Sequence, residues 1–271
     1  MKNPDLPFRM WRHCFALAAV ALVYYLAARL SLLMMFKETN ASPVWLPSGL
    51  AMAVVLVMGN KMWPGVFVGA FAANIVGFLS SGNPLPVSLL MSGSIALGNT
   101  LEALAGVYLL LKFIDGRNPF RCMRHAFLFI ICSALVAPLI SASIGVLSIW
   151  GGNVIPGSAF LYVWWTWWTG DLTGALLIVP LIVVWALPTG PLKSGHLAEF
   201  AAMCVLLVFL SMTSFVAPIE IGGSEISGLI YLPIPLLLWL VFRFDARITL
   251  TLLLVLNSIA IYGSISGVEI H

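Results

Sequence analysis

The feature that most constrains this chain is a series of long apolar runs with few interruptions. They lie near residues 13–34, 43–60, 63–80, 88–111, 126–149, 158–187, 200–217, 228–242 and 248–266. A bilayer core of about 30 Å needs roughly 20 apolar residues per helix, and most of these runs have about that length. The strands of an outer-membrane barrel would instead alternate apolar and polar residues. The sequence therefore predicts an all-α fold, a polytopic transmembrane helical bundle of about eight to nine spans.

The composition excludes a water-soluble protein. Of the 271 residues, 61% are apolar and 8% are charged, so polar side chains could not cover the surface of a soluble domain. We therefore expect the chain to be surrounded by a lipid bilayer. Its formal net charge of +3 comes from loop residues that set the topology, and we expect no nucleic-acid partner.

The basic residues predict the orientation. With a cytoplasmic N-terminus, all thirteen Lys and Arg residues except Arg29 and Lys37 fall on the inner side, as the positive-inside rule requires.

No enzyme motif interrupts the apolar runs. The sequence has no phosphate-binding glycine loop, no His-Glu zinc motif and no nucleophile elbow, and its loops are too short to hold such sites. The four cysteines lie at inner helix ends or within apolar runs, as small packing residues do. We expect no catalytic residue and no metal site in this chain.

Small residues recur every four positions in the third, fourth and fifth runs. Such stripes let helix backbones approach closely in lipid, which predicts that these three helices form the tight centre of the bundle. The stripes are Gly65, Gly69, Ala73 and Gly77; Ser94, Gly98, Glu102 and Gly106; and Ser133, Ala137, Ser141 and Gly145.

Charged side chains inside the runs indicate a functional site, because a charge in a bilayer is costly unless it is paired, protonated or hydrated. Glu102, Arg29 and Asp171 are such residues. Counting the helical rise from each inner end places Glu102 at about 15 Å and Arg29 and Asp171 at about 24 Å. Asn74 and Asn99 fall between them, so we expect a polar site in the outer half of the membrane.

The stretch "SPVWLPSG" begins the second run with Pro43, Trp45 and Pro47. Prolines leave backbone carbonyls without partners, which is tolerated in a membrane where protein or a wet cavity covers them. We interpret this stretch as a wall of the polar pocket. The alternative is a proline-kinked span whose tryptophan belongs to the interfacial aromatic belt.

The stretch "LYVWWTWWTGDLTGALLIVP" holds four tryptophans before Asp171. As belt residues they would anchor the segment at the outer interface, which is the reading we favour. Alternatively, Trp168, which shares a helical face with Asp171, packs on a ligand.

The histidines allow one cofactor. His13 and His125 lie near the inner ends of two runs, so a bis-histidine haem is conceivable. Interfacial histidines beside arginines are the commoner arrangement, and an absorption spectrum without a Soret band would exclude haem.

Several motifs together carry a family resemblance over nearly the whole chain. They are "SPVWLPSGLA", "WPGVFVGAFAAN", "ALGNTLEALAG", "ISASIGVLSIW", "WWTWWTGDLTGALLIVPL" and "LWLVFRF". In this order they resemble the first type of membrane-associated sensor domain, the MASE family of bacterial signalling proteins. The resemblance implies an inner-membrane sensory module followed by a cytoplasmic output domain: a diguanylate cyclase, a cyclic-di-GMP phosphodiesterase or a histidine kinase. It also points to Asn74, Asn99, Glu102 and Asp171 as signature polar positions, but supplies no ligand.

Two classes of function follow. In a receptor module, a small ligand or a membrane partner biases two packings of the bundle. A transporter or substrate-capture subunit would show the same broken helix and polar site in its sequence. We find no internal repeat, which a transporter often has. The resemblance favours the sensor. The candidate ligand-binding residues are Arg29, Trp45, Pro47, Asn74, Asn99, Glu102, Trp168 and Asp171.

We expect residues 1–271 to be a sensor domain cut from a longer protein. Nine spans that start inside end outside, which predicts a tenth helix, an output domain beyond residue 271 and a homodimer formed through that domain.

Two contacts are predicted within the site. Asn99 and Glu102 lie three apart on one helical face, with Asn74 facing them from the third run. Arg29 pairs with Asp171, at the same estimated depth, and leaves Glu102 free or protonated. The alternative for Arg29 is a side chain that reaches out to the interface.

Overall fold

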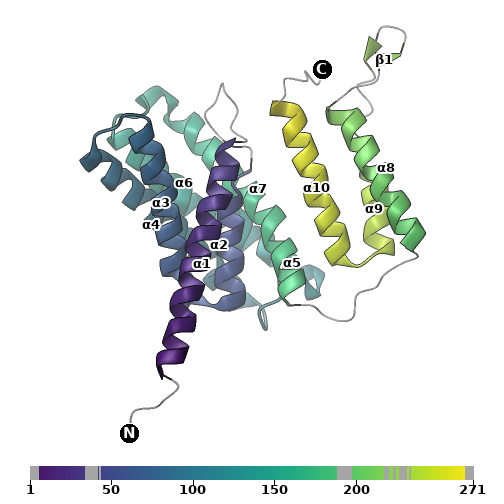
Figure 1. Ribbon diagram of the computed structural model, residues 1–271, viewed down its shortest axis with the longest axis horizontal. Coiled ribbons are helices and arrows are strands. Elements are labelled where there is room, and N and C mark those ends of the chain that lie inside the picture. Colours follow the sequence, from purple (N-terminus) through teal and green to yellow (C-terminus); the bar gives the residue numbers. More distant parts are fainter. Residues whose placement is uncertain are drawn as a thin grey trace. The chain divides into compact units, whose positions relative to one another are not determined.

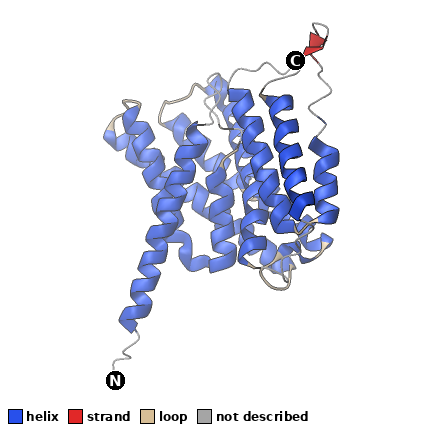
Figure 2. Cartoon of the chain, turned by 45° about the vertical axis from the view of Figure 1, so that its right-hand side comes forward, coloured by secondary structure: helices blue, strands red, loops and turns tan. Residues whose placement is uncertain are grey.

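The computed structural model describes residues 6–33, 42, 44–187, 197–216, 220–221, 224–225, 231 and 233–265. These residues are almost entirely helical (Figure 2), which confirms the predicted all-α bundle. The helices are α1 (Leu6–Leu33), α2 (Leu46–Met58), α3 (Trp63–Ser80), α4 (Leu85–Phe113), α5 (Met123–Leu128), η3 (Phe129–Val136), α6 (Pro138–Gly151), α7 (Phe160–Ala186), α8 (Leu197–Phe215), α9 (Pro233–Arg243) and α10 (Ala246–Ile265).

Six of the described helical stretches are long and apolar enough to cross a membrane. Shorter apolar helices occupy Leu46–Met58, Glu199–Phe215 and Pro233–Arg243. Two antiparallel strands of two residues each, β1 (Glu220–Ile221) and β2 (Ser224–Glu225), are the strand structure of the described part. The helices correspond to the predicted runs, and contacts divide the chain into a first unit, 1–183, and a second unit, 184–271.

Helix α4 is central to the packing of the first unit, because it packs against α2, α3 and α6. Figure 1 shows it beside α3. The small residues of α4 and α6 face one another as predicted: a Cβ added at Gly98 would fall 3.5 Å from the Cα of Ser141. The stripe of α3 differs. Gly65 and Gly69 lie against α1, where added Cβ atoms would fall 2.7 Å from the carbonyl oxygens of Leu17 and Ala21. The centre therefore includes α1 as well.

Proline occupies the first turn of α2 and favours the start of the helix there. Pro47 has no backbone N–H, so none is left without a partner at this position. The backbone N–H of Trp45 donates to the Gly170 carbonyl of α7 at 2.9 Å. Pro43, the other proline of the predicted wall, lies outside the described residues.

Two glycines allow α2 and α7 to cross closely. A Cβ at Gly49 would meet the carbonyl oxygen of Gly174, and a Cβ at Gly174 would meet the carbonyl oxygen of Trp45. Backbone contacts therefore fix the start of α2 on residues 169–174 of α7, "TGDLTG". No residue larger than glycine fits at position 49 or 174.

The run predicted as one helix over 126–149 contains a π-helical segment, η3. Pro138 lies two residues after its end and lacks the N–H that would bond to the carbonyl four residues earlier, so the helix before it widens. Trp168 uses this segment: its indole Nε1 donates to the Leu135 carbonyl at 3.0 Å.

The second unit is a small helical group in which α8 packs on α10 and α9 (Figure 1). Arg243 at the end of α9 donates to both carboxylate oxygens of Glu199 near the start of α8, with Nη2 2.9 Å from Oε2. The buried apolar residues of this unit are Leu207, Leu236, Leu240, Phe244 and Leu252.

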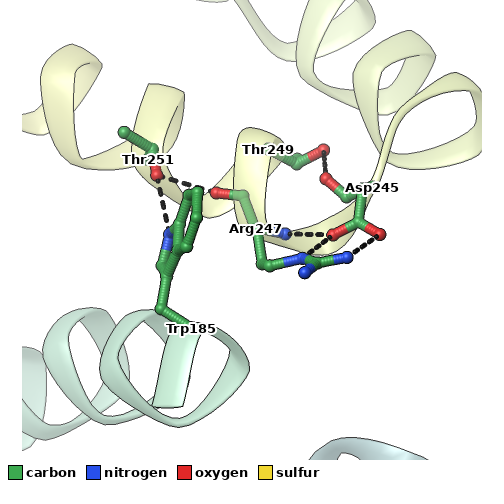
Figure 3. Close-up of polar contacts among 5 residues, drawn as sticks. All are labelled: Trp185, Asp245, Arg247, Thr249 and Thr251. Atoms are coloured by element: carbon green, nitrogen blue, oxygen red, sulfur yellow. Dashed lines mark hydrogen bonds and ion pairs between the residues drawn. The ribbon is translucent and has the colours of Figure 1, made fainter. Parts of the chain in front are cut away.

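Helix α10 begins at a polar turn (Figure 3). The Asp245 carboxylate accepts from the backbone N–H of Arg247 at 3.0 Å and from its guanidinium Nε at 2.8 Å. The Trp185 indole donates to Thr251 at 3.3 Å, and the Arg247 guanidinium lies 6.0 Å from the Trp185 ring centroid. These contacts cap the helix and shield its arginine.

Candidate functional site

Two acidic side chains are buried at the centre of the first unit. Glu102 of α4 is 1% exposed and Asp171 of α7 is 0% exposed. The two carboxyls face one another. Within the described part of the chain, Glu102 Oε2 and both oxygens of Asp171 have no hydrogen-bond partner. Such unsatisfied acceptors are uncommon in a folded interior and indicate a site rather than packing.

Glu102 is held by the start of α2. The Ser48 hydroxyl donates to Glu102 Oε1. Two residues before Ser48, the backbone N–H of Leu46 donates to the Ser31 hydroxyl of α1 at 3.0 Å. A helix N-terminus carries partial positive charge, so the start of α2 is a favourable neighbour for a carboxylate.

A hydrogen-bonded chain crosses the bundle beside the carboxyls. Asn99 of α4 donates through Nδ2 to the Tyr24 hydroxyl of α1 at 2.9 Å. Its Oδ1 accepts from the Ser141 hydroxyl of α6 at 2.7 Å, and the Trp167 indole of α7 donates to Ser141 at 3.2 Å. Ser141 and Trp167 also face the Asp171 carboxyl. Five helices, α1, α2, α4, α6 and α7, therefore meet at one cluster.

Comparison with known proteins then decides the family. The MASE1 family matches residues 16–269. The chain belongs to the MASE1 family. The resemblance drawn from the motifs is thus confirmed, and with it the assignment of the chain as a membrane sensor domain of the bacterial inner membrane.

This MASE1 domain is also similar to "Probable diguanylate cyclase DgcE" of Escherichia coli (strain K12), with 29% identity over 169 residues. The match covers 61% of this chain and 14% of that protein, so the chain spans a small part of the relative's length. No solved structure matches the chain.

The MASE1 domain brings five of the eight predicted site residues together. Asn99, Glu102 and Asp171 belong to the buried cluster. Pro47 is buried at the start of α2, one residue from Ser48. Trp45 is half-buried, binds Gly170 through its backbone and faces Tyr24 through its side chain.

The predicted ion pair between Arg29 and Asp171 is wrong. Arg29 is exposed on α1, whereas Asp171 is completely buried, and the ion pairs of the described residues join Arg243 to Glu199 and Arg247 to Asp245. The exposed arginine agrees with the alternative of a side chain that reaches the interface. Glu102 was placed about 9 Å deeper than Asp171 by a rise count that takes helices as untilted, yet the two carboxyls face each other.

Asn74 and Trp168 have other partners than predicted. Asn74 donates to the Ala70 carbonyl of its own helix at 2.8 Å, and the partner of Asn99 is Tyr24 instead. Trp168 is half-buried against η3 through Leu135. Trp164 similarly donates to Ser143 of α6 at 3.2 Å, while Trp165 is 55% exposed. Trp164 and Trp168 therefore join α7 to the bundle, and the interfacial belt stays a prediction.

The sequence reading missed the neutral members of the cluster as site residues: Tyr24, Ser48, Ser141 and Trp167. Ser141 belongs to a small-residue stripe, and the sequence indicates only a packing role for it. Ser48 follows Pro47 directly, and a serine in the first turn of a proline-started helix is the signal that could have identified it. Trp167 lies over Gly145, where an added Cβ would fall 2.6 Å from its Cζ2.

The haem hypothesis stays a prediction. In the described ranges no group of three or more His, Cys, Asp and Glu side chains could hold a metal ion, and neither this nor the positions of His13 and His125 tests a two-histidine haem.

Proposed function

We propose that this MASE1 domain is the input unit of a membrane-bound signalling protein, in which a small ligand or a membrane partner acts at the buried cluster. The output domain follows residue 271 after a further span, lies in the cytoplasm and is a diguanylate cyclase, a cyclic-di-GMP phosphodiesterase or a histidine kinase. The N-terminus is cytoplasmic, and the whole protein is a homodimer through its output domain. The similarity to a probable diguanylate cyclase of Escherichia coli favours a diguanylate cyclase as the output domain.

One observation carries this proposal: residues from five helices meet at a cluster that contains three unsatisfied carboxyl oxygens. Any binding event there changes contacts on α1, α2, α4, α6 and α7 at once. A shared contact point of this kind lets a ligand select between two packings of the bundle, provided that it binds one of them better.

The test is a fusion of residues 1–271, extended by one transmembrane helix, to a diguanylate cyclase. Cellular cyclic-di-GMP is measured for the unchanged fusion, Glu102→Gln and Asp171→Asn. We expect each variant to change output at least severalfold while its amount in the membrane stays the same. Glu199→Gln is the matched control, because it removes one surface ion pair worth about 1 kcal/mol or less. Equal output from all fusions would contradict the proposal.

The transporter alternative keeps one supporting feature, the short helix α2 that begins beside buried carboxyls, as discontinuous helices of transporters do. Purified chain in proteoliposomes would accumulate a labelled substrate under an ion gradient if this alternative holds. A fusion whose output responds to Glu102→Gln, combined with no uptake, favours the sensor.

A further inference from the structure

The facing carboxyls of Glu102 and Asp171 lack a compensating charge. In the part of the chain that the structure describes, neither takes part in an ion pair, and Arg29 is exposed. The groups that surround them are neutral: the Tyr24 hydroxyl on α1, Ser48 on α2, and Ser141 on α6. Among the described residues, Tyr24 is the one other titratable group that faces the two carboxyls.

Two ionised carboxylates cannot lie side by side in this environment. Their repulsion is strong where water is excluded, and each would also lose its hydration. A single proton removes most of the cost, since the protonated carboxyl donates to the ionised one, as in carboxyl pairs that share a proton in enzyme sites. The three carboxyl oxygens without a partner can form such a bond: one carries the proton and donates, and an oxygen of the other carboxyl accepts.

We propose that Glu102 and Asp171 form a proton-binding site that holds one proton between them, and that this proton is the small ligand of the sensor. The second clause rests on the proposed function. Two carboxylates and one proton give an O–H···O⁻ pair with a net charge of −1. The Ser48 hydroxyl and the N-terminus of α2 stabilise that remaining charge on Glu102.

Release of the proton leaves two facing carboxylates, one on α4 and one on α7. Their repulsion separates the two helices, and α2 is fixed to both of them, by Ser48 to Glu102 and by the Trp45 backbone to Gly170. Occupancy of the site is thereby coupled to the packing of α2. The tight crossing at Gly49 and Gly174 leaves little room for partial movement, which favours two discrete packings.

The chemistry of the site favours a proton over a metal ion. A hard cation takes at least six oxygen ligands in most protein sites, and it would be repelled by the positive end of α2. The described residues supply two carboxyls here and no group of three His, Cys, Asp or Glu side chains that could hold a metal ion. A proton needs neither more ligands nor a cavity, which agrees with the complete burial of Asp171.

Infrared difference spectroscopy on the purified chain 1–271 in lipid nanodiscs tests the site without any output domain. The spectrum of Glu102→Gln/Asp171→Asn is subtracted from that of the unchanged chain across a pH series, in sodium-free buffer. We expect a C=O band of a protonated carboxylic acid that shifts in D₂O. It should disappear in two separate steps as pH rises in the unchanged chain, and in one step in Glu102→Gln and in Asp171→Asn.

Each outcome decides between readings. A flat difference spectrum, or two carboxyls that titrate together as in water, overturns the proton site and leaves the fusion experiment unaffected. A band that responds to added Na⁺ at fixed pH also overturns it and assigns a sodium site. Tyr24→Phe guards against misfolded variants: it keeps both carboxyls, so the two-step titration should persist. If the pair titrates in two steps but the output of the fusions ignores both carboxyl variants, the proposed function falls, and with it the proton as the ligand, while the proton-binding site stands.

Discussion

At the residue scale, the start of α2 is joined to the cluster by one side chain. Ser48 is buried and donates to Glu102, so its loss leaves a carboxyl oxygen without a partner. We expect Ser48→Ala to lower the free energy of unfolding by about 1–3 kcal/mol, the usual cost of an unsatisfied buried group next to a charge. Thermal unfolding of the detergent-solubilised chain measures this change.

Ser92 is the matched control for this prediction. It is equally buried on α4, but its hydroxyl has no partner among the described residues. Removing an unsatisfied hydroxyl should be neutral or stabilising, so Ser92→Ala is expected to unfold at or above the temperature of the unchanged chain. Equal losses in both variants would show that the hydroxyl of Ser48 has no special role.

The same scale shows what a sequence can and cannot predict. Glu102 and Asp171 were identifiable because a carboxylate in an apolar run is costly wherever it points. Ser141 and Trp167 were not, because a hydroxyl or an indole in a membrane is common and can find hydrogen-bond partners in several ways. The Arg29 pair failed for a related reason: a count of helical rise ignores tilt, and the face that a residue presents depends on the packing of its neighbours.

At the element scale, the crossing of α2 and α7 depends on two glycines. In Gly174→Ala the new Cβ would meet the carbonyl oxygen of Trp45, which is backbone and cannot rotate away. We expect a loss of about 1–3 kcal/mol in unfolding free energy, as for overpacked cores, together with altered output in the fusion. Chemical denaturation followed by intrinsic fluorescence measures the unfolding free energy.

Gly77→Ala on α3 is the control for the crossing. Nothing lies within 4 Å of a Cβ at Gly77, so the change should stabilise the helix by up to about 1 kcal/mol through propensity alone. A Gly174→Ala chain as stable as Gly77→Ala would mean that α2 and α7 are further apart than described.

The π-helical segment makes a second prediction at this scale. Trp168→Phe removes the indole donor to the Leu135 carbonyl, and we expect a cost of about 1 kcal/mol from this hydrogen bond, more if the carbonyl stays unsatisfied. Trp165→Phe, on an exposed side chain of the same helix, should cost less. Parallel thermal unfolding curves compare the two, and an equal cost would contradict the anchoring role of Trp168.

Elements were predictable where hydrophobic length decides and not where packing decides. The runs at 63–80, 88–111 and 158–187 became α3, α4 and α7 because about 20 apolar residues have few alternatives in a bilayer. The stripe of Gly65 and Gly69 marked a close contact correctly but not its partner, α1, since small residues show that a helix is near without showing which one.

At the scale of the whole molecule, the ends of the helices predict which loops share a side of the membrane. The Arg117 guanidinium donates to the Val57 carbonyl at 3.0 Å, so the loops at 59–62 and 114–118 lie at the same end of the first unit. The loops at 81–84 and 152–156 follow helices that run away from that end. Basic residues concentrate in the first pair of loops, which predicts that this pair is cytoplasmic.

Cysteine labelling tests this orientation in intact cells. In a chain whose four native cysteines are replaced, single cysteines at the exposed positions Ser81 and Val154 should react with a membrane-impermeant maleimide, because their loops face outward. Cysteines at the exposed positions Lys61 and Asp115 should react only after the membrane is opened. The reverse pattern would place the start of α2 and its carboxyl pair in the inner half of the membrane. A proton bound there would report cytoplasmic pH, whereas the expected pattern connects the site to the acidity outside the cell.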